Sequence, residues 1–170
     1  MNPSGVVVRP CEIRDVEAVA AIYAHHVLHG VATFEIQPPG AGEMERRLRA
    51  LIDRGYPYLV AESEGEVLGY AYAGPYRPRP AYRFTVENSV YVRSDALGRG
   101  TGRMLMQALI AECVARGFRQ MIAVIGDSSN VASIGLHESL GFNVVGILRS
   151  VGFKFGRWLD SVLMQRELTA

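Results

Sequence analysis

The hydrophobic and polar positions of the chain alternate between a helical period and a strand period. Apolar residues recur at helical spacing after Asp15, a candidate N-cap, and again from Glu43 to Arg54, where Gly55 stops the pattern. Short apolar runs predict strands at residues 6–8, 58–62, 67–73 and 84–92. The polar segment 63–66 contains a glycine and predicts a hairpin turn. Residues 25–39 show neither period, so we expect them to be irregular.

The second half of the chain continues the alternation of strands and helices. A wide apolar stripe opens at Met104 and predicts a deeply buried helix that ends before Gly117. The remaining apolar runs predict three strands and one short helix, at residues 121–125, 144–148 and 158–168 and at residues 131–140. No linker, repeat or low-complexity segment divides the chain. The pattern therefore predicts one α/β domain, residues 1–170, in which helices flank a mixed sheet.

Composition restricts the functions that are compatible with this pattern. The chain has 170 residues, of which 49% are hydrophobic, and this suffices for one buried core. Cys11 and Cys113 are too few and too far apart for a disulfide framework or a zinc site, so we expect no metal. No apolar stretch approaches the ~18 residues of a membrane span, and the N-terminus lacks the pattern of a signal peptide. These observations lead us to expect a cytoplasmic protein. Because 18 Lys and Arg nearly balance 17 Asp and Glu, we expect a small-molecule partner rather than nucleic acid.

A glycine-rich segment joins the strand that ends at Val92 to the helix that follows. Glycine has no Cβ atom, so an anion can approach the backbone closely. The first N–H groups of a helix have no partners within it, and the helix dipole favours negative charge at that end. Two arginines add cationic donors on either side. We therefore identify a candidate phosphate cradle in Gly98, Arg99, Gly100, Thr101, Gly102 and Arg103.

Two nucleotide-binding motifs are excluded by the same segment. A nucleoside-triphosphatase loop ends in Lys followed by Ser or Thr, whereas this one ends in Gly102, Arg103 and Met104. A dinucleotide-binding fingerprint has the spacing G-x-G-x-x-G near the start of a βαβ unit. Here the glycines alternate, and the segment lies past the middle of the chain. The phosphate that we expect therefore belongs to a different kind of ligand.

Four more motifs follow one another along the chain: GPYRPRPAY at residues 74–82, TVENSVYV at 85–92, LHESLGF at 136–142 and KFGRWLD at 154–160. Together with the R-G-x-G turn, they resemble the GNAT superfamily of acetyl-coenzyme A-dependent N-acetyltransferases, in its phosphinothricin and methionine sulfone or sulfoximine acetyltransferase branch. One position departs from that family, because Leu97 stands where Gln or Arg is common. The resemblance implies acetyl-CoA as cosubstrate, a homodimer, and a single GNAT-like domain with a mixed, mostly antiparallel sheet.

The strand at residues 84–92 carries a candidate general base, Glu87. A carboxylate inside a central strand is costly to bury, so we expect Glu87 to be partnered, solvated by a pocket or raised in pKa. Each of these states suits a base that accepts a proton directly or through a water molecule. A structural ion pair with Arg77, Arg79 or Arg83 is the alternative. The resemblance favours the role of base, because Glu87 matches the family's strand glutamate.

The resemblance also implies contacts with the cosubstrate. It suggests that the pantetheine arm binds by strand-like hydrogen bonds to the backbone of Val90, Tyr91 and Val92, whose side chains remain free to pack. Asn130 and Ser133 begin the short helix and are candidate caps, and their family positions add contacts with the coenzyme. His137 resembles the family's helix histidine near the acceptor and the thioester sulfur and is the second candidate catalytic residue, because a histidine pKa near neutrality suits proton transfer. Its alternative is an ordinary hydrogen-bonded or surface histidine.

An arginine- and proline-rich segment at residues 76–82 is a candidate acceptor loop. Such a composition suits bidentate binding of a carboxylate by a pre-shaped backbone, and a solvated connector is the alternative. The resemblance implies an acceptor amino acid with a polar γ-substituent such as phosphinate, sulfone or sulfoximine. The candidate acceptor contacts are Phe34, Arg77, Pro78, Arg79, Tyr82 and Glu87. We interpret His25 and His26 as surface or interface groups.

Two other functions compete with acetyl transfer to a small amine. An acyl-CoA-binding module without catalysis has no use for Glu87 beside a thioester. An acetyltransferase that acts on proteins or peptides needs an open groove, whereas the closely spaced side chains of residues 76–82 suggest a confined site. Phe153, Phe155 and Trp158 lie in a segment punctuated by glycine, where they suit either an apolar dimer surface or the core.

Overall fold

The structure is a computed structural model that describes residues 5–169, with seven strands in one sheet and four α-helices. The strands are β1 (Val7–Pro10), β2 (Tyr58–Ser63), β3 (Glu66–Pro75), β4 (Thr85–Val92), β5 (Gln120–Gly126), β6 (Asn143–Lys154) and β7 (Arg157–Glu167). The helices are α1 (Val16–His29), α2 (Ala41–Ile52), α3 (Thr101–Ala115) and α4 (Val131–Ser139). The strand order is β1-β2-β3-β4-β5-β7-β6, and only β4 and β5 run parallel. The predicted mixed, mostly antiparallel sheet flanked by helices is confirmed.

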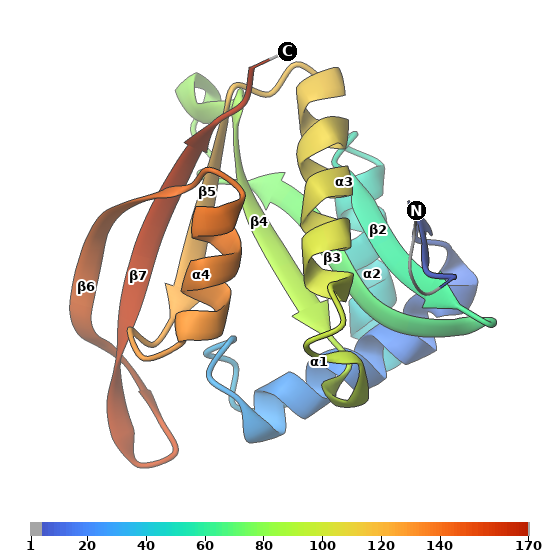
Figure 1. Cartoon of the computed structure of the whole chain (residues 1–170), viewed down its shortest axis with the longest axis horizontal. Helices are drawn as coiled ribbons and strands as arrows, with labels where there is room; N and C mark the ends of the chain where they lie inside the picture. The colour runs from blue at the N-terminus through green and yellow to red at the C-terminus, as the bar shows by residue number, and fades with distance from the viewer. Residues whose placement is uncertain (1–4, 170) are drawn as a thin grey trace.

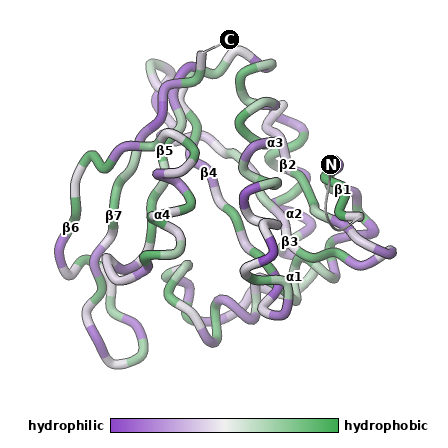
Figure 2. The backbone as a smooth tube through the Cα atoms, viewed as in Figure 1, coloured by the Kyte–Doolittle hydropathy of each residue, from purple (hydrophilic) through white to green (hydrophobic). Residues whose placement is uncertain are grey.

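Helices cover both faces of the sheet, with α3 and α4 on one face and α1 and α2 on the other (Figure 1). Successive side chains of a strand point to opposite faces, so each face has a core of its own. On β4, Val86 belongs to the core beneath α3, and Tyr91 belongs to the aromatic core beneath α1 and α2. Figure 2 shows hydrophobic and hydrophilic residues interspersed along the helices and strands. Within residues 5–169, no helix combines the length and the apolar character needed to cross a membrane.

The sheet opens between its two parallel strands. β4 and β5 pair only where residues 85–88 lie opposite residues 120–123, and beyond this point β4 stays with β3 while β5 stays with β7. The N–H of Arg93 donates to the carbonyl of Leu68 at 2.8 Å, which fixes the hydrogen-bonding phase of β3 and β4. In that phase, the backbone groups of Val90 and Val92 point away from β3 and toward the opening. An extended, peptide-like ligand can therefore pair with this edge of β4.

Two tight hairpins join consecutive strands. The turn between β2 and β3 has positive φ at Glu64 (53°) and Gly65 (81°), and the turn between β6 and β7 has positive φ at Phe155 (52°) and Gly156 (71°). Two consecutive residues with positive φ are typical of a type I′ turn, whose twist matches that of the strands. The hairpin predicted at residues 63–66 is confirmed.

Several elements extend beyond their predicted bounds, and for α1, α3 and β6 the structure shows the reason. α1 continues to His29, because Val27 is buried and prolongs its apolar stripe, so the prediction of irregular structure from residue 25 is wrong for this turn. α3 begins at Thr101, before the predicted start, because Gly100 takes a left-handed conformation that closes the turn there. β6 reaches Lys154, because its pairing with β7 resumes after a register shift between Leu148 and Gly152. This irregularity masked the strand period in the sequence.

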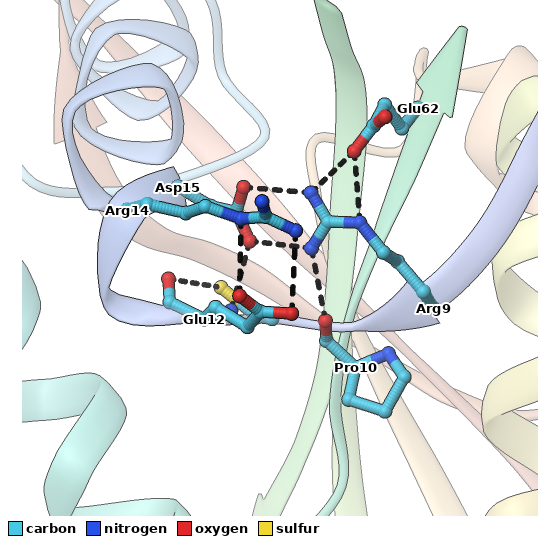
Figure 3. Close-up of polar contacts among 7 residues, drawn as sticks. Arg9, Pro10, Glu12, Arg14, Asp15 and Glu62 are labelled. Atoms are coloured by element: carbon cyan, nitrogen blue, oxygen red, sulfur yellow. Dashed lines mark hydrogen bonds and ion pairs between the residues drawn. The ribbon is translucent and has the colours of Figure 1, made fainter. Parts of the chain in front are cut away.

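Asp15 has a different role from the predicted helix cap (Figure 3). Its carboxylate accepts hydrogen bonds from the Arg9 guanidinium at 2.7 and 2.8 Å and from the N–H of Glu12 at 2.8 Å. Arg9 also pairs with Glu62 on β2. The hydrogen bond from Arg9 holds the pKa of the buried Asp15 carboxyl below its usual range, although burial opposes this. Asp15 therefore joins β1 to the turn before α1, and within the described residues it makes no side-chain capping bond to α1.

Candidate active site

The glycine-rich turn forms one end of a cavity of about 380 Å³ at the N-terminus of α3. Gly98 and Gly100 have φ of +72° and +82°, and a Cβ atom at either position would meet nothing within 4 Å. These glycines are thus needed for backbone conformation, and the space above them is open to a ligand. The lining includes many of the predicted cosubstrate contacts, namely Val90, Val92, Gly98, Gly100, Thr101, Gly102, Arg103, Asn130 and Ser133. An elongated ligand with a phosphate at the α3 end fits this cavity.

Two of the predicted contacts lie outside this lining. Arg99 is exposed on the turn. Tyr91 directs its ring into the core on the opposite face, where it packs edge-on against Tyr23 with 5.1 Å between ring centroids. The ring of Tyr91 therefore lies away from the opening, and its backbone polar groups pair with Tyr70 of β3. Arg103 donates to the Ser139 hydroxyl at 3.1 Å and so connects α3 to the end of α4.

A second, smaller cavity of about 50 Å³ lies where β4 and β5 diverge. Residues from β4 and β5 form its walls, and His137 of α4 closes one side. It shares Ala32, Val90, Asn130 and Ser133 with the larger cavity, so the two adjoin. We call the combined space the β4–β5 opening. It connects the phosphate cradle to the middle of the sheet.

Glu87 lies on β4 and faces α1 and α2, as the strand alternation predicted. Its side chain is half-buried, and burial raises the pKa of its carboxyl above the usual range, whereas the charge of Arg77 lowers it. Among the described residues, none of the ion pairs joins Glu87 to Arg77, Arg79 or Arg83. The structural ion pair considered from the sequence is therefore absent from this part of the chain. A half-buried carboxyl with a raised pKa suits a proton acceptor.

His137 lies on the opposite face of β4 and is 2% exposed. Its Nδ1 is 2.8 Å from the carbonyl oxygen of Ser133, and its Nε2 is 3.0 Å from Oδ1 of Asn88. Asn88 in turn donates to the carbonyl of Ile122 at 3.2 Å. Burial lowers the pKa of His137, so the ring is neutral at pH 7. Both ring nitrogens face protein oxygens, and the neutral ring, which has one N–H, can donate to only one of them. The contact of His137 with Asn88 and that of Asn88 with Ile122 link α4 to both strands at the point where they diverge.

Asn130 caps α4, because its Oδ1 accepts the N–H of Ser133 at 3.2 Å. The cap predicted from the sequence is thus present. Asn130 also lines both parts of the β4–β5 opening. Capping and contact with a ligand are compatible, since the amide nitrogen of Asn130 remains for a second partner.

The predicted acceptor loop lies at the other end of β4, before Thr85, and is well exposed. The Arg77 guanidinium lies over the ring of Tyr76 at 5.1 Å, and this ring meets Tyr82 edge-on with 5.6 Å between centroids. Pro80 opens a short 3-10 turn that positions Tyr82. Arg79 and Pro78 are exposed beside them. The loop thus presents two guanidinium groups and two aromatic rings to solvent near the face that carries Glu87.

Phe34 reaches the site from a separate segment, the connection between α1 and α2. Its ring is 38% exposed and packs against Gly126 and Gly152, where an added Cβ atom would come within 3.0 and 2.4 Å of ring carbons. Gly126 also lines the β4–β5 opening. Phe34 therefore lies close to the end of that opening, as its predicted acceptor role requires.

Several residues near the site were missed by the sequence. His26 was interpreted as a surface group, but it is half-buried, its Nε2 is 2.9 Å from the carbonyl oxygen of Val92, and it lines the larger cavity. Burial lowers the pKa of His26. Ala32 borders both cavities, and Tyr72 of β3 lies on the Glu87 face of the sheet. Only contacts between distant segments identify these residues, so no local signal in the sequence could have found them.

The aromatic residues of the C-terminal hairpin are exposed. Phe153, Phe155 and Trp158 are 55%, 56% and 66% exposed, and Phe153 meets Trp158 with 5.0 Å between ring centroids. The alternative that they fill the core is therefore wrong. Together with exposed aliphatic side chains along β6, they form an apolar surface. No cluster of three or more His, Cys, Asp or Glu within residues 5–169 is arranged to hold a metal ion.

An open, parallel strand pair with a glycine-lined helix N-terminus defines the class of protein. Residues 8–163 match the family model described as an acetyltransferase (GNAT) domain. The chain belongs to the GNAT acetyltransferase family, as its motifs predicted, and it is an acetyl-CoA-dependent N-acetyltransferase.

Individual relatives refine this assignment. Phosphinothricin N-acetyltransferase of Alcaligenes faecalis is 58% identical over 156 residues, which cover 92% of this chain and 79% of the relative. The L-methionine sulfoximine/L-methionine sulfone acetyltransferase of Pseudomonas aeruginosa is 44% identical over 162 residues, which cover 95% and 94% of the two chains. The crystal structure of a GNAT superfamily phosphinothricin acetyltransferase from Sinorhizobium meliloti, in complex with acetyl-CoA, matches with a TM-score of 0.94 and 47% identity over 96% of this chain and 89% of the other. Acetyl-CoA is the cosubstrate.

Proposed function

We propose that this enzyme acetylates the α-amine of a small amino-acid analogue such as phosphinothricin, methionine sulfone or methionine sulfoximine, with Glu87 as the base. The observation that carries the proposal is the Glu87 carboxyl, half-buried without an ion-pair partner among the described residues, with a raised pKa. The named activities of the relatives support this class of acceptor.

In the proposed reaction, acceptor and acetyl-CoA bind together and the amine attacks directly. Acetyl-CoA supplies a thioester, in which the bond from the acyl carbon to sulfur breaks as a bond to the amine nitrogen forms. Glu87 accepts the proton that the nitrogen loses, directly or through a water molecule, and the departing thiolate takes up a proton. A carboxyl with a raised pKa is a stronger base than an exposed glutamate, which favours this transfer.

The residues of the opening have the task of holding the cosubstrate. We assign the pantetheine arm to the backbone edge of β4, where Val90 and Val92 point their polar groups away from β3 and Tyr91 lies between them. We assign the pyrophosphate to the α3 N-terminus, with its glycines and arginines. Contacts are proposed for Gly98, Arg99, Gly100, Thr101, Gly102, Arg103, Asn130 and Ser133.

His137 has a supporting role in this proposal. Its contacts to Ser133 and Asn88 hold α4 against β4 beside the small cavity, where we expect the thioester to lie. Because the ring is buried and both of its nitrogens face protein oxygens, we expect a change at His137 to reduce turnover less than a change at Glu87.

The acceptor is proposed to bind between the 76–82 loop and Phe34. Arg77 and Arg79 offer planar, bidentate donors to an acidic group, and Tyr82 and Pro78 supply the adjacent wall. Phe34, on the connection between α1 and α2, packs against Gly126 at the end of the β4–β5 opening. A free α-amine then lies toward Glu87, and a γ-phosphinate, sulfone or sulfoximine group lies toward the arginines.

A panel of acceptors tests this function. Purified protein is incubated with acetyl-CoA and with phosphinothricin, methionine sulfone, methionine sulfoximine, common amino acids, an arylamine or a lysine-rich protein, and release of free thiol is followed. We expect the three analogues to react fastest and N-blocked forms to be inert. For Arg79→Lys we expect the acceptor KM to rise about tenfold, since lysine lacks the planar fork. Arg46→Lys, an exposed change on α2, is the matched control.

Other outcomes favour the competing functions. Faster acetylation of protein lysines or arylamines than of every amino-acid analogue would exclude the proposed acceptor class. Binding of acetyl-CoA without turnover on any amine would indicate a binding module.

The structure also supports two wider proposals. The exposed apolar surface of the C-terminal hairpin is the area through which we propose a homodimer, and a monomer at all micromolar concentrations in light scattering would contradict it. Cys11 and Cys113 are both free and buried, which supports the reducing cytoplasm as the compartment.

A further inference from the structure

Lys154 is a buried cation whose contacts lie far away in the sequence. Its side chain is 4% exposed at the end of β6, and its Nζ donates to the carbonyl oxygens of Gly30 and Thr33, both at 2.8 Å. Burial lowers the pKa of Lys154, and the charge of Glu35 raises it. Lysine is almost never fully buried without partners, so these two carbonyls are the reason that the ammonium group can remain here.

The segment that Lys154 holds is the 30–35 loop, which follows α1 and carries Phe34. The same C-terminal hairpin touches this loop a second time, because Gly152 leaves room for the Phe34 ring, and a Cβ atom there would lie 2.4 Å from a ring carbon. On β5, Gly126 leaves room for the carbonyl of Val31, which a Cβ atom would approach to 2.1 Å. The loop is therefore seated on the sheet by close contacts that allow it little freedom.

The other side of the 30–35 loop is fastened to the helices. The Tyr23 hydroxyl lies 2.8 Å from the Thr33 hydroxyl and donates to Glu35 at 2.9 Å, and Arg47 donates to Glu35 at 2.6 Å. These contacts hold the loop to α1 and α2 but not to the half of the sheet beyond the β4–β5 opening. Lys154 supplies the polar connection across to that half.

We propose that Lys154 is a positioning residue for the acceptor, which fixes the 30–35 loop so that Phe34 closes the acceptor end of the β4–β5 opening. This inference rests on the proposed function, because it assigns the effect to the acceptor rather than to acetyl-CoA. Without the ammonium group, the carbonyls of Gly30 and Thr33 lose their hydrogen-bond donor. These carbonyls can then find other donors only if the loop moves. Phe34 moves with it.

The test compares Lys154→Met with wild type in two measurements. Amide hydrogen exchange on the unliganded protein reports on the loop itself, and we expect faster exchange at residues 30–35. Steady-state kinetics with methionine sulfone or phosphinothricin report on function, and we expect the acceptor KM to rise about tenfold while the KM for acetyl-CoA stays within twofold. Arg149→Met is the matched control, because it removes an exposed cation from the same strand that pairs with Asp160 rather than with a carbonyl of the loop. It should leave both measurements unchanged.

A second variant keeps the ammonium group and moves the ring. In Gly152→Ala the added methyl group displaces the Phe34 ring, so this variant should raise the acceptor KM without removing the Lys154 contacts. If Lys154→Met does not fold, the kinetics of Gly152→Ala decide whether the position of Phe34 affects acceptor binding. An unchanged rate of amide hydrogen exchange at residues 30–35 in Lys154→Met would show that Lys154 does not hold the loop. Faster exchange with an unchanged acceptor KM, or an unchanged KM in Gly152→Ala, would overturn the positioning role. If wild type acetylates no amino acid, the proposed function fails instead, and the exchange result still decides whether Lys154 holds the loop.

Discussion

The two faces of β4 give their titratable side chains, His137 and Glu87, opposite surroundings. On the face of α3 and α4, His137 is buried with both ring nitrogens within 3.0 Å of oxygen atoms. On the face of α1 and α2, Glu87 is half-buried, without an ion pair among the described residues, and burial raises the pKa of its carboxyl. A buried polar group that is hydrogen-bonded stabilises the fold, whereas a carboxylate buried without a cationic partner lowers stability. The comparison therefore separates a residue that maintains the site from one that is available for chemistry.

The largest effect is expected for Glu87→Gln. The amide keeps the shape of the side chain but cannot accept the amine proton, so kcat should fall about 10²-fold while the Kd for acetyl-CoA is unchanged. Because the raised pKa of Glu87 means that its charge destabilises the folded state, the variant should have a higher Tm than wild type at pH 7. Stopped assays, calorimetric titration and thermal unfolding measure the three quantities. Glu112→Gln, at an exposed ion pair on α3, serves as the control, and a Glu87→Gln enzyme with most of its turnover would assign Glu87 a structural role.

The cosubstrate side is tested by Gly100→Val. This position has φ of +82°, which valine adopts only with strain, and its side chain would enter the space above the α3 N-terminus. We expect the Kd for acetyl-CoA to rise about tenfold, with little change in far-UV circular dichroism. Gly40→Val, at an open position of negative φ before α2, should leave the affinity unchanged. Equal affinities of the two variants for acetyl-CoA would contradict the assignment of the glycine-rich turn as the phosphate cradle.

His137→Leu should reverse the pattern of Glu87→Gln. Removing the ring leaves the buried Asn88 amide oxygen and the Ser133 carbonyl without this partner, so the free energy of unfolding should fall by about 2 kcal/mol. We expect kcat to fall only a few-fold when it is measured below the unfolding transition. Urea unfolding and steady-state kinetics on the same preparation provide the comparison. A loss of turnover as large as that of Glu87→Gln would make His137 a participant in proton transfer.

The dependence on pH offers the smallest but most specific contrast. Glu87 must be ionised to act as a base, and its pKa is raised, so kcat/KM should increase with pH through a value above the usual range of a glutamate. This acid limb should disappear in Glu87→Gln. The pKa of His137 is lowered on folding, so its contribution to stability is complete above the unfolded pKa of about 6.5 and is lost as pH falls below it. Stability profiles of wild type and His137→Leu should therefore converge toward acid pH.

Local chemistry in the sequence was enough to predict much of this protein. The strand period of residues 84–92 placed Glu87 opposite Val86 and Asn88, because the side-chain period of a strand is fixed by backbone geometry. The glycine-rich turn before α3 could also be predicted from the sequence, since glycine readily adopts the positive φ found at Gly98 and Gly100. The exposed aromatic residues of the last hairpin were noticed too, although the sequence left open whether they filled the core.

Tertiary structure alone decided what these local features meet. The separation of β4 from β5, the contact of His26 with Val92, and the contacts of Lys154 with the 30–35 loop join segments that are distant in the chain. The same is true of the ring of His137, whose engagement with Asn88 depends on how α4 packs against the sheet. A hydrophobic period specifies which face of an element is buried, but not which polar atoms lie opposite it after packing. The sequence therefore determines which residue types are present in this active site. Long-range contacts determine which of these residues pair with one another, and hence their pKa values and their availability for reaction.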